Sequence, residues 1–168
     1  MPDDIIIDMD GNDQGAAMIA ILQKLGETEE AVAALYRAYA EVWPADGAFW
    51  RTLAKTEDGH RAYIGHVIVM VRERPDDFRP VHFFSVEMLD TFIKKIQGHA
   101  VMARAGQLNE KQALYEAHQI ENMALESELA LLFKSGNAEF LRFSATILSE
   151  EKEHRDAIHR LIQERYPK

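Results

Sequence analysis

The chain contains no cysteine. Disulfides, thiolate catalysis and any zinc or iron centre held by cysteine are therefore excluded within it. It also lacks an apolar run of about 18 residues, which a membrane-spanning helix requires. Its N-terminus opens with acidic residues instead of the basic stretch and hydrophobic core of a signal peptide. We therefore expect a cytoplasmic protein with no membrane partner.

Basic residues are scarce relative to acidic ones. The 168 residues include 19 Lys and Arg against 28 Asp and Glu, which gives a formal net charge of −9. Phosphate backbones are bound by Lys and Arg, so no nucleic-acid partner is expected. With 47% hydrophobic residues, the chain is long enough for one domain with a substantial core and too short for two of ordinary size.

Helix-ending signals divide the first half of the chain. A first long helix ends at Pro44, and Asp46 in the following turn is a plausible N-cap for a second. The second helix runs to about Arg74, where Pro75 stops it. An amphipathic segment from about 85 to 103 follows, and it belongs to the connection between the two halves.

The second half repeats the pattern of a helix pair. Asn109 and Gln112 are spaced as a capping box, and the helix that follows closes near Ser135 and Gly136. Asn137 can cap the last helix, which runs almost to the C-terminus. The expected fold is all-α, with a ferritin-like four-helix bundle whose long crossover carries an additional helix.

The N-terminal part is less clearly patterned. We expect residues 1–26 to be an extension, partly helical or disordered, and residues 27–168 to form the bundle domain. The segment Gln14 to Leu25 fits either a separate short helix or a continuation of the first bundle helix across Gly26. The sequence leaves both alternatives open.

Two Glu/His pairs interrupt apolar helical stripes. Glu57 and His60, and likewise Glu151 and His154, are three residues apart and so lie on one helix face. Stepping along each helix by three and four gives mainly apolar neighbours, so both pairs point inward. A buried carboxylate must be neutralised. Neither stripe contains Lys or Arg, which favours a metal ion as the neutralising partner.

The other two helices each offer an inward carboxylate. Glu29 and Glu121 are the candidates, because a di-metal bundle needs one further Glu from each remaining helix. Thr28 could instead cap a helix beginning there, which would make Glu29 a first-turn residue. His118 and Glu128 share the stripe of Glu121 and could modify the site. Four carboxylates would balance the charge of two divalent ions.

We expect Glu57 with His60 to hold one ion and Glu151 with His154 to hold the other. Glu29 and Glu121 would complete or bridge the pair. The neighbouring Glu30 and Glu150 fall off their stripes. The aromatic residues of the first two helices are expected to pack in the core: Tyr36, Tyr39, Trp43 and Trp50.

Several segments resemble the rubrerythrin-like branch of the ferritin-like di-iron superfamily. They cover the four bundle helices but neither the N-terminal segment nor the crossover: Glu29 through Tyr36, Phe49 through His60, Ala117 through Glu121, and Glu150 through His154. The resemblance implies two iron ions, with zinc or manganese possible, and it implies that Tyr36 lies near the site as a candidate catalytic residue. The chain departs from the family at position 124, where Ala stands in place of a second Glu.

Rubrerythrins proper also carry a rubredoxin module with four Cys, which this chain lacks. The resemblance therefore implies reduction of peroxide, or reaction with dioxygen, using electrons from an external donor protein. Alternatives are iron oxidation and storage, metal binding without reductase turnover, and a ferritin-like interaction protein. A homo-oligomer, preferably a dimer, is expected because the crossover has apolar side chains that a second copy could cover: Phe83, Phe84, Met88 and Phe92.

Overall fold

The computed structural model describes residues 11–81, 85–123 and 132–167. These residues are helical apart from short turns and one small sheet, so the expected all-α class is confirmed. The helices are α1 (Gly11–Val42), α2 (Gly47–Glu73), α3 (Val86–Arg104), α4 (Glu110–Asn122) and α6 (Ala138–Arg165). Two 3₁₀ turns, η1 (Pro44–Asp46) and η2 (Pro75–Asp77), precede α2 and the strand β1 (Phe78–Pro80), which pairs with β2 (Phe133–Ser135).

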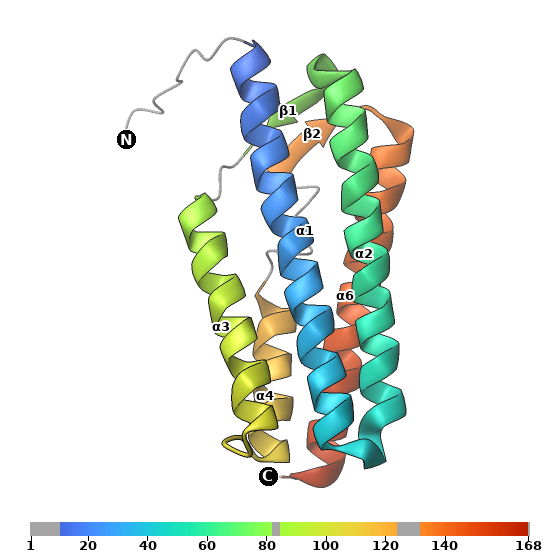
Figure 1. Ribbon diagram of the computed structural model, residues 1–168. Coiled ribbons are helices and arrows are strands. Elements are labelled where there is room, and N and C mark those ends of the chain that lie inside the picture. Colours follow the sequence, from blue (N-terminus) through green and yellow to red (C-terminus); the bar gives the residue numbers. More distant parts are fainter. Residues whose placement is uncertain (1–10, 82–84, 124–131, 168) are drawn as a thin grey trace, which may run out of the picture.

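The helices run side by side along one long axis (Figure 1). α1 and α2 form an antiparallel hairpin, α3 packs along α1, and α4 packs against α6. α2 also contacts α6, which joins the two helix pairs. α3 lies in the connection between α2 and α4, as the sequence predicted for residues 85 to 103.

α1 is one uninterrupted helix that passes through Gly26. The segment Gln14 to Leu25 is therefore a continuation of this helix and not a separate one. Met18 and Leu22 are 1% and 0% exposed, so this part contributes to the core. A Cβ at Gly26 would meet Ile64 Cγ2 of α2 at 3.8 Å, which places this position at the contact between the two helices. Residues 1–10 lie outside the described part.

The first hairpin turns at Pro44, as expected, but Asp46 does not cap α2 through its side chain. Its carboxylate instead accepts hydrogen bonds from the guanidinium of Arg165, with Nη1 2.6 Å from Oδ2. Arg165 also donates to Glu110 at 2.7 Å. Asp46 occupies the predicted N-cap position, but a charged partner at the end of α6 binds the carboxylate that would have capped the helix. The contact ties both helix pairs together at this end of the molecule.

α3 begins at Ser85, whose hydroxyl accepts a hydrogen bond from the amide of Met88 at 3.1 Å. Leu89, Phe92 and Ile96 are buried and belong to the core that α3 shares with the rest of the chain. Phe92 is therefore covered by its own chain, whereas the Met88 side chain is 48% exposed. Phe83 and Phe84 lie outside the described residues. The homo-dimer stays a prediction, but Phe92 is buried within its own chain and no longer supports it.

The capping box at Asn109 and Gln112 is confirmed, with both reciprocal hydrogen bonds present. The predicted extent of this helix is wrong: α4 ends at Asn122, and Phe133–Ser135 is a strand. Phe133 is buried and Lys134 is exposed, the two-residue alternation of a strand with one covered face. β2 pairs antiparallel with β1, with Arg79 opposite Lys134. Residues 124–131 lie outside the described part.

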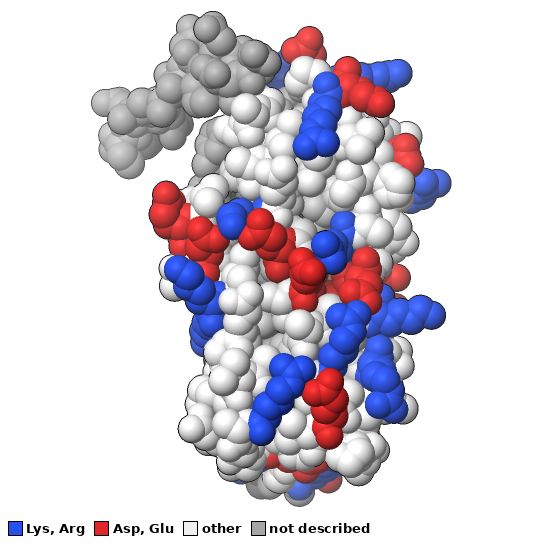
Figure 2. Space-filling view, in the orientation of Figure 1, with Lys and Arg blue, Asp and Glu red and all other residues white. Residues whose placement is uncertain are grey.

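α6 begins as predicted at Asn137, whose side-chain oxygen accepts from the amides of Glu139 and Phe140 at 3.0 Å each. Among the described helices, none combines the length and apolar character needed to cross a membrane. On the face that Figure 2 shows, acidic and basic side chains are interspersed and separated by uncharged surface. This face therefore carries no broad patch of one sign.

Candidate metal centre

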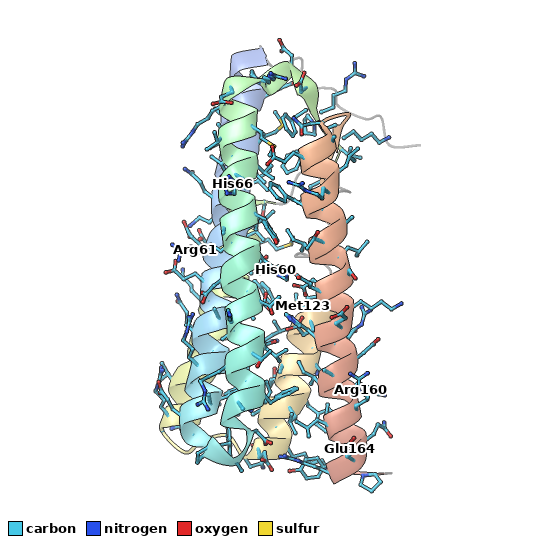
Figure 3. The ribbon with its side chains drawn as sticks, turned by 90° about the vertical axis from the view of Figure 1, so that its right-hand side faces the viewer. His60, Arg61, His66, Met123, Arg160 and Glu164 are labelled. Carbon is cyan, nitrogen blue, oxygen red and sulfur yellow. The ribbon has the colours of Figure 1, made fainter. Side chains whose placement is uncertain are left out.

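Four helices direct ionisable side chains into the interior at one level. These residues are Glu29 of α1, Glu57 and His60 of α2, Glu121 of α4, and Glu151 and His154 of α6. All six are at most 6% exposed. Figure 3 shows His60 on the side of α2 that faces α6, whereas the adjacent Arg61 lies on the other side. The imidazole rings of His60 and His154 stack with centroids 6.0 Å apart.

The six side chains form two groups that could each hold a metal ion. Within each group, one potential ligand atom per residue lies within 4.8 Å of all the others. The first group is Glu29, Glu57, His60 and Glu151, and the second is Glu57, Glu121, Glu151 and His154. Glu57 and Glu151 belong to both groups and are therefore placed to bridge two ions. Glu29 and Glu121 each belong to one group, so they are placed as terminal ligands.

Both imidazoles turn the same nitrogen toward the carboxylates. His60 Nδ1 lies 3.1 Å from Glu57 Oε2 and 3.0 Å from Glu151 Oε1. His154 Nδ1 lies 2.8 Å from Glu57 Oε1 and 3.9 Å from Glu121 Oε2. Nδ1 is therefore the donor atom that each histidine would offer to a metal ion.

The other nitrogen of His60 contacts Glu150, a residue for which the sequence pattern predicted no role. His60 Nε2 lies 2.9 Å from Glu150 Oε2, and the Glu150 side chain is 36% exposed. A metal-bound imidazole commonly donates its second N–H to a carboxylate, which fixes the tautomer and the ring orientation. Position 150 lies off the inward stripe of α6, and its position next to Glu151 was the only signal for it in the sequence.

Tyr36 lies beside the site. Its side chain is fully buried, and its hydroxyl donates a hydrogen bond to Glu121 Oε1. Tyr36 belongs to α1 and Glu121 to α4, so this hydrogen bond orients the carboxylate from a neighbouring helix.

Several buried polar atoms of the site have no hydrogen-bond partner of acceptable geometry within the described part of the chain. Such atoms are costly in a protein interior and call for a ligand. Oxygen and imidazole donors together suit iron, manganese or zinc. The orphaned atoms are both carboxylate oxygens of Glu29, Oε1 of Glu57, Oε2 of Glu121, Oε1 of Glu151 and Nδ1 of His154. The residues present therefore fit metal ions.

Four carboxylates lie close together in the buried cluster, and this environment shifts the pKa values of Glu29, Glu121 and Glu57. Burial, followed by the charge of Glu57, raises the pKa of Glu29 well above its usual value. Burial and the charge of Glu151 do the same to the pKa of Glu121. Burial alone would also raise the pKa of Glu57, but the contacts with His154 and His60 outweigh it and hold this pKa at about 2.

The pKa of His60 moves in the opposite direction. Burial disfavours its charged form, but the contacts with Glu151 and Glu57 outweigh burial and raise its pKa to about 11. Without metal, the raised pKa values therefore favour protonation of Glu29 and Glu121, which makes them neutral, and of His60, which makes it cationic. A metal ion that binds here must displace these protons.

His118 belongs to neither group. It is half-buried, has no carboxylate contact among the described residues, and lies with its Nδ1 3.0 Å from Asn122 Nδ2. Its ring centroid is 5.4 Å from that of His159. Glu128 lies outside the described residues. The alternative in which Thr28 caps a helix is wrong, because Thr28 lies inside α1 and its hydroxyl donates to the carbonyl of Lys24 at 2.9 Å.

Comparison with known proteins does not identify a family. No protein-family model, no curated protein and no solved structure matches this chain.

Proposed function

We propose that the chain is a ferritin-like four-helix bundle with a di-iron carboxylate centre that reduces peroxide, or reacts with dioxygen, with electrons from an external donor protein. The observation that carries the proposal is the pair of four-residue groups that share Glu57 and Glu151. Shared carboxylates hold two ions close together, as two-metal sites require.

The charge of the site supports a pair of divalent ions over one. Four carboxylates carry a charge of about −4 when ionised, and two divalent ions carry +4. Two irons held side by side would supply or take up two electrons together, which is what the conversion of peroxide to water requires. The donor set also accepts zinc and manganese, so iron is the part of the proposal that most needs a direct measurement.

The residues of the chain have separate tasks in this proposal. Glu57 and Glu151 would be shared by the two ions, and His60 and His154 would each hold one ion through Nδ1. Tyr36 orients Glu121 and keeps a proton next to that carboxylate. Because the six ligands are at most 6% exposed, the surrounding helices exclude bulk water from the site.

An electron donor outside this chain is required because the chain has no cysteine with which to hold a cluster or iron centre of its own. The need for a reductant distinguishes this function from two alternatives, iron oxidation with storage and metal binding without turnover. A peroxidase consumes peroxide continuously when a donor is supplied, whereas the other two do not.

The test is elemental analysis of anaerobically purified, iron-replete protein, followed by a peroxide consumption assay with a chemical reductant. We expect about two iron ions per chain, as in other two-metal carboxylate sites. Both ions and peroxide turnover should be lost in the Glu57→Gln/Glu151→Gln double variant, which keeps the side-chain volume. Glu30→Gln is the matched control, because Glu30 is exposed on α1, pairs with Arg61 and belongs to neither candidate ligand group. Zinc, or no metal, in the unaltered protein would refute the di-iron proposal.

A further inference from the structure

Tyr36 joins the candidate metal centre to a group of aromatic rings. Its hydroxyl donates to Glu121, and its ring centroid lies 5.4 Å from that of Trp50. Both side chains are at most 1% exposed. Tyr36 is therefore the contact between a candidate ligand on α4 and the aromatic residues of the α1–α2 hairpin.

The rings continue without a gap to the end of α1. The centroid of Trp50 lies 5.1 Å from that of Tyr39, which lies 5.3 Å from that of Trp43. Aromatic rings whose centroids are about 4.5–7 Å apart are in contact. Trp43 is half-buried and immediately precedes Pro44 in the turn. The four rings thus lead from the buried centre to the surface.

The sequence reasoning assigned these aromatic residues to core packing, but packing does not account for the Tyr39 hydroxyl. This group is buried and has no hydrogen-bond partner among the described residues. An unpaired buried hydroxyl is costly, so phenylalanine would serve packing better. Burial, together with the charge of Glu116, also raises the pKa of Tyr39 and keeps its proton on the ring oxygen. A tyrosine at this position therefore needs a reason other than packing.

Tyrosine and tryptophan rings give up a single electron far more readily than phenylalanine or aliphatic side chains. We infer that Tyr36, Trp50, Tyr39 and Trp43 form a path for single electrons between the metal centre and the surface at the α1–α2 turn. This inference rests on the proposed redox function. The path also specifies where an external one-electron donor protein would deliver its electrons.

Once peroxide had oxidised the centre, Tyr36 would give up one electron to it while its phenolic proton passes to Glu121. Tyr36 then regains an electron from Trp50 or Tyr39 and takes its proton back from Glu121. The electron vacancy moves to Trp43, where the one-electron donor protein fills it. One electron has then moved from donor to centre, and a two-electron oxidant such as peroxide requires two such transfers.

The test uses iron-loaded, full-length protein exposed to peroxide without any reductant, so that electron vacancies remain on the path. Peptide mass spectrometry then measures oxidation at each Tyr and Trp. We expect oxidation to concentrate at Trp43 and to be lost there in Tyr39→Phe, which keeps the ring and removes a hydroxyl that has no partner among the described residues. Tyr63→Phe is the matched control, because Tyr63 stacks on Phe143 at 4.8 Å, away from the path. Circular dichroism verifies that both variants fold.

Zinc-loaded protein treated in the same way distinguishes oxidation of Trp43 through the path from direct oxidation of an exposed side chain by peroxide. Zinc has no redox chemistry, so Trp43 should stay unoxidised in that sample. Equal oxidation of Trp43 with zinc and iron, or unchanged oxidation in Tyr39→Phe, would overturn the path. If the same iron-loaded protein still consumed peroxide once a chemical reductant was supplied, the proposed function would remain intact. A protein that binds no iron at all would overturn both.

Discussion

Glu150 is the residue outside the ligand set whose removal should affect the centre most selectively. It contacts His60 Nε2 at 2.9 Å and lies at the edge of the site, partly in solvent. Loss of such a partner typically weakens metal binding by about 10-fold to 100-fold. We therefore expect Glu150→Ala to weaken binding of one of the two ions by about this factor, as measured by competition with a chelator.

The ion affected should be the one that His60 would hold, because the described residues place a carboxylate against His60 Nε2 but none against His154 Nε2. Glu153→Gln is a suitable control, since Glu153 is an exposed residue of the same helix. Equal weakening of both ions in Glu150→Ala, or similar weakening in the Glu153 variant, would show that Glu150 acts through general charge and not through His60.

The buried Glu and His residues that could hold metal ions were predictable from the sequence because they interrupt otherwise apolar helical stripes, as Glu57 and His60 illustrate best. The sequence did not predict which carboxylates could be shared by two ions. That depends on how closely α2 and α6 approach each other, and the pattern of apolar residues along one helix contains no information on this distance. The role of Glu150 was hidden for a related reason, since a residue at the edge of a stripe acquires a partner only through a neighbouring helix.

At the level of helices, the capping box of α4 offers a direct test of how strongly local signals stabilise the site. Asn109 accepts from the Gln112 amide at 2.9 Å, and the Gln112 side chain accepts from the Asn109 amide at 3.0 Å. Replacing an N-cap asparagine by alanine costs about 1 kcal/mol. Asn109→Ala should lower the free energy of unfolding by about this amount in urea denaturation.

Gln107→Ala serves as the comparison, because Gln107 is exposed in the same turn, donates its backbone amide to the Met102 carbonyl and takes no part in the capping box. An equal loss of stability in both variants would mean that the turn, and not the cap, is responsible. The capping box was predictable because both partners lie within one turn of sequence. The end of α4 at Asn122 and the pairing of β2 with β1 were not, since the strands are more than fifty residues apart.

At the scale of the whole molecule, the metal-free protein buries several acidic groups without metal ions to balance their charge, and metal binding should relieve this repulsion. The pKa values of Glu29 and Glu121 are raised, so the folded protein holds protons that the unfolded chain releases above pH 4.5. Their contribution to stability is full below pH 4.5 and is lost as the pH rises through their raised values. His60 acts in the same direction between 6.5 and about 11. Glu57 acts oppositely, but only as the pH falls from 4.5 to about 2.

Metal-free protein should therefore become less stable as the pH rises above 4.5, whereas metal binding, which needs these groups deprotonated, should stabilise the protein more at higher pH. Thermal unfolding with and without metal across this range measures both slopes. Glu29→Gln removes one of the titrating acids without changing its size, so it should flatten the metal-free slope and reduce the stabilisation by metal. A metal-free protein whose melting temperature rises with pH would contradict this account, because the raised pKa values permit only the opposite sign for these groups.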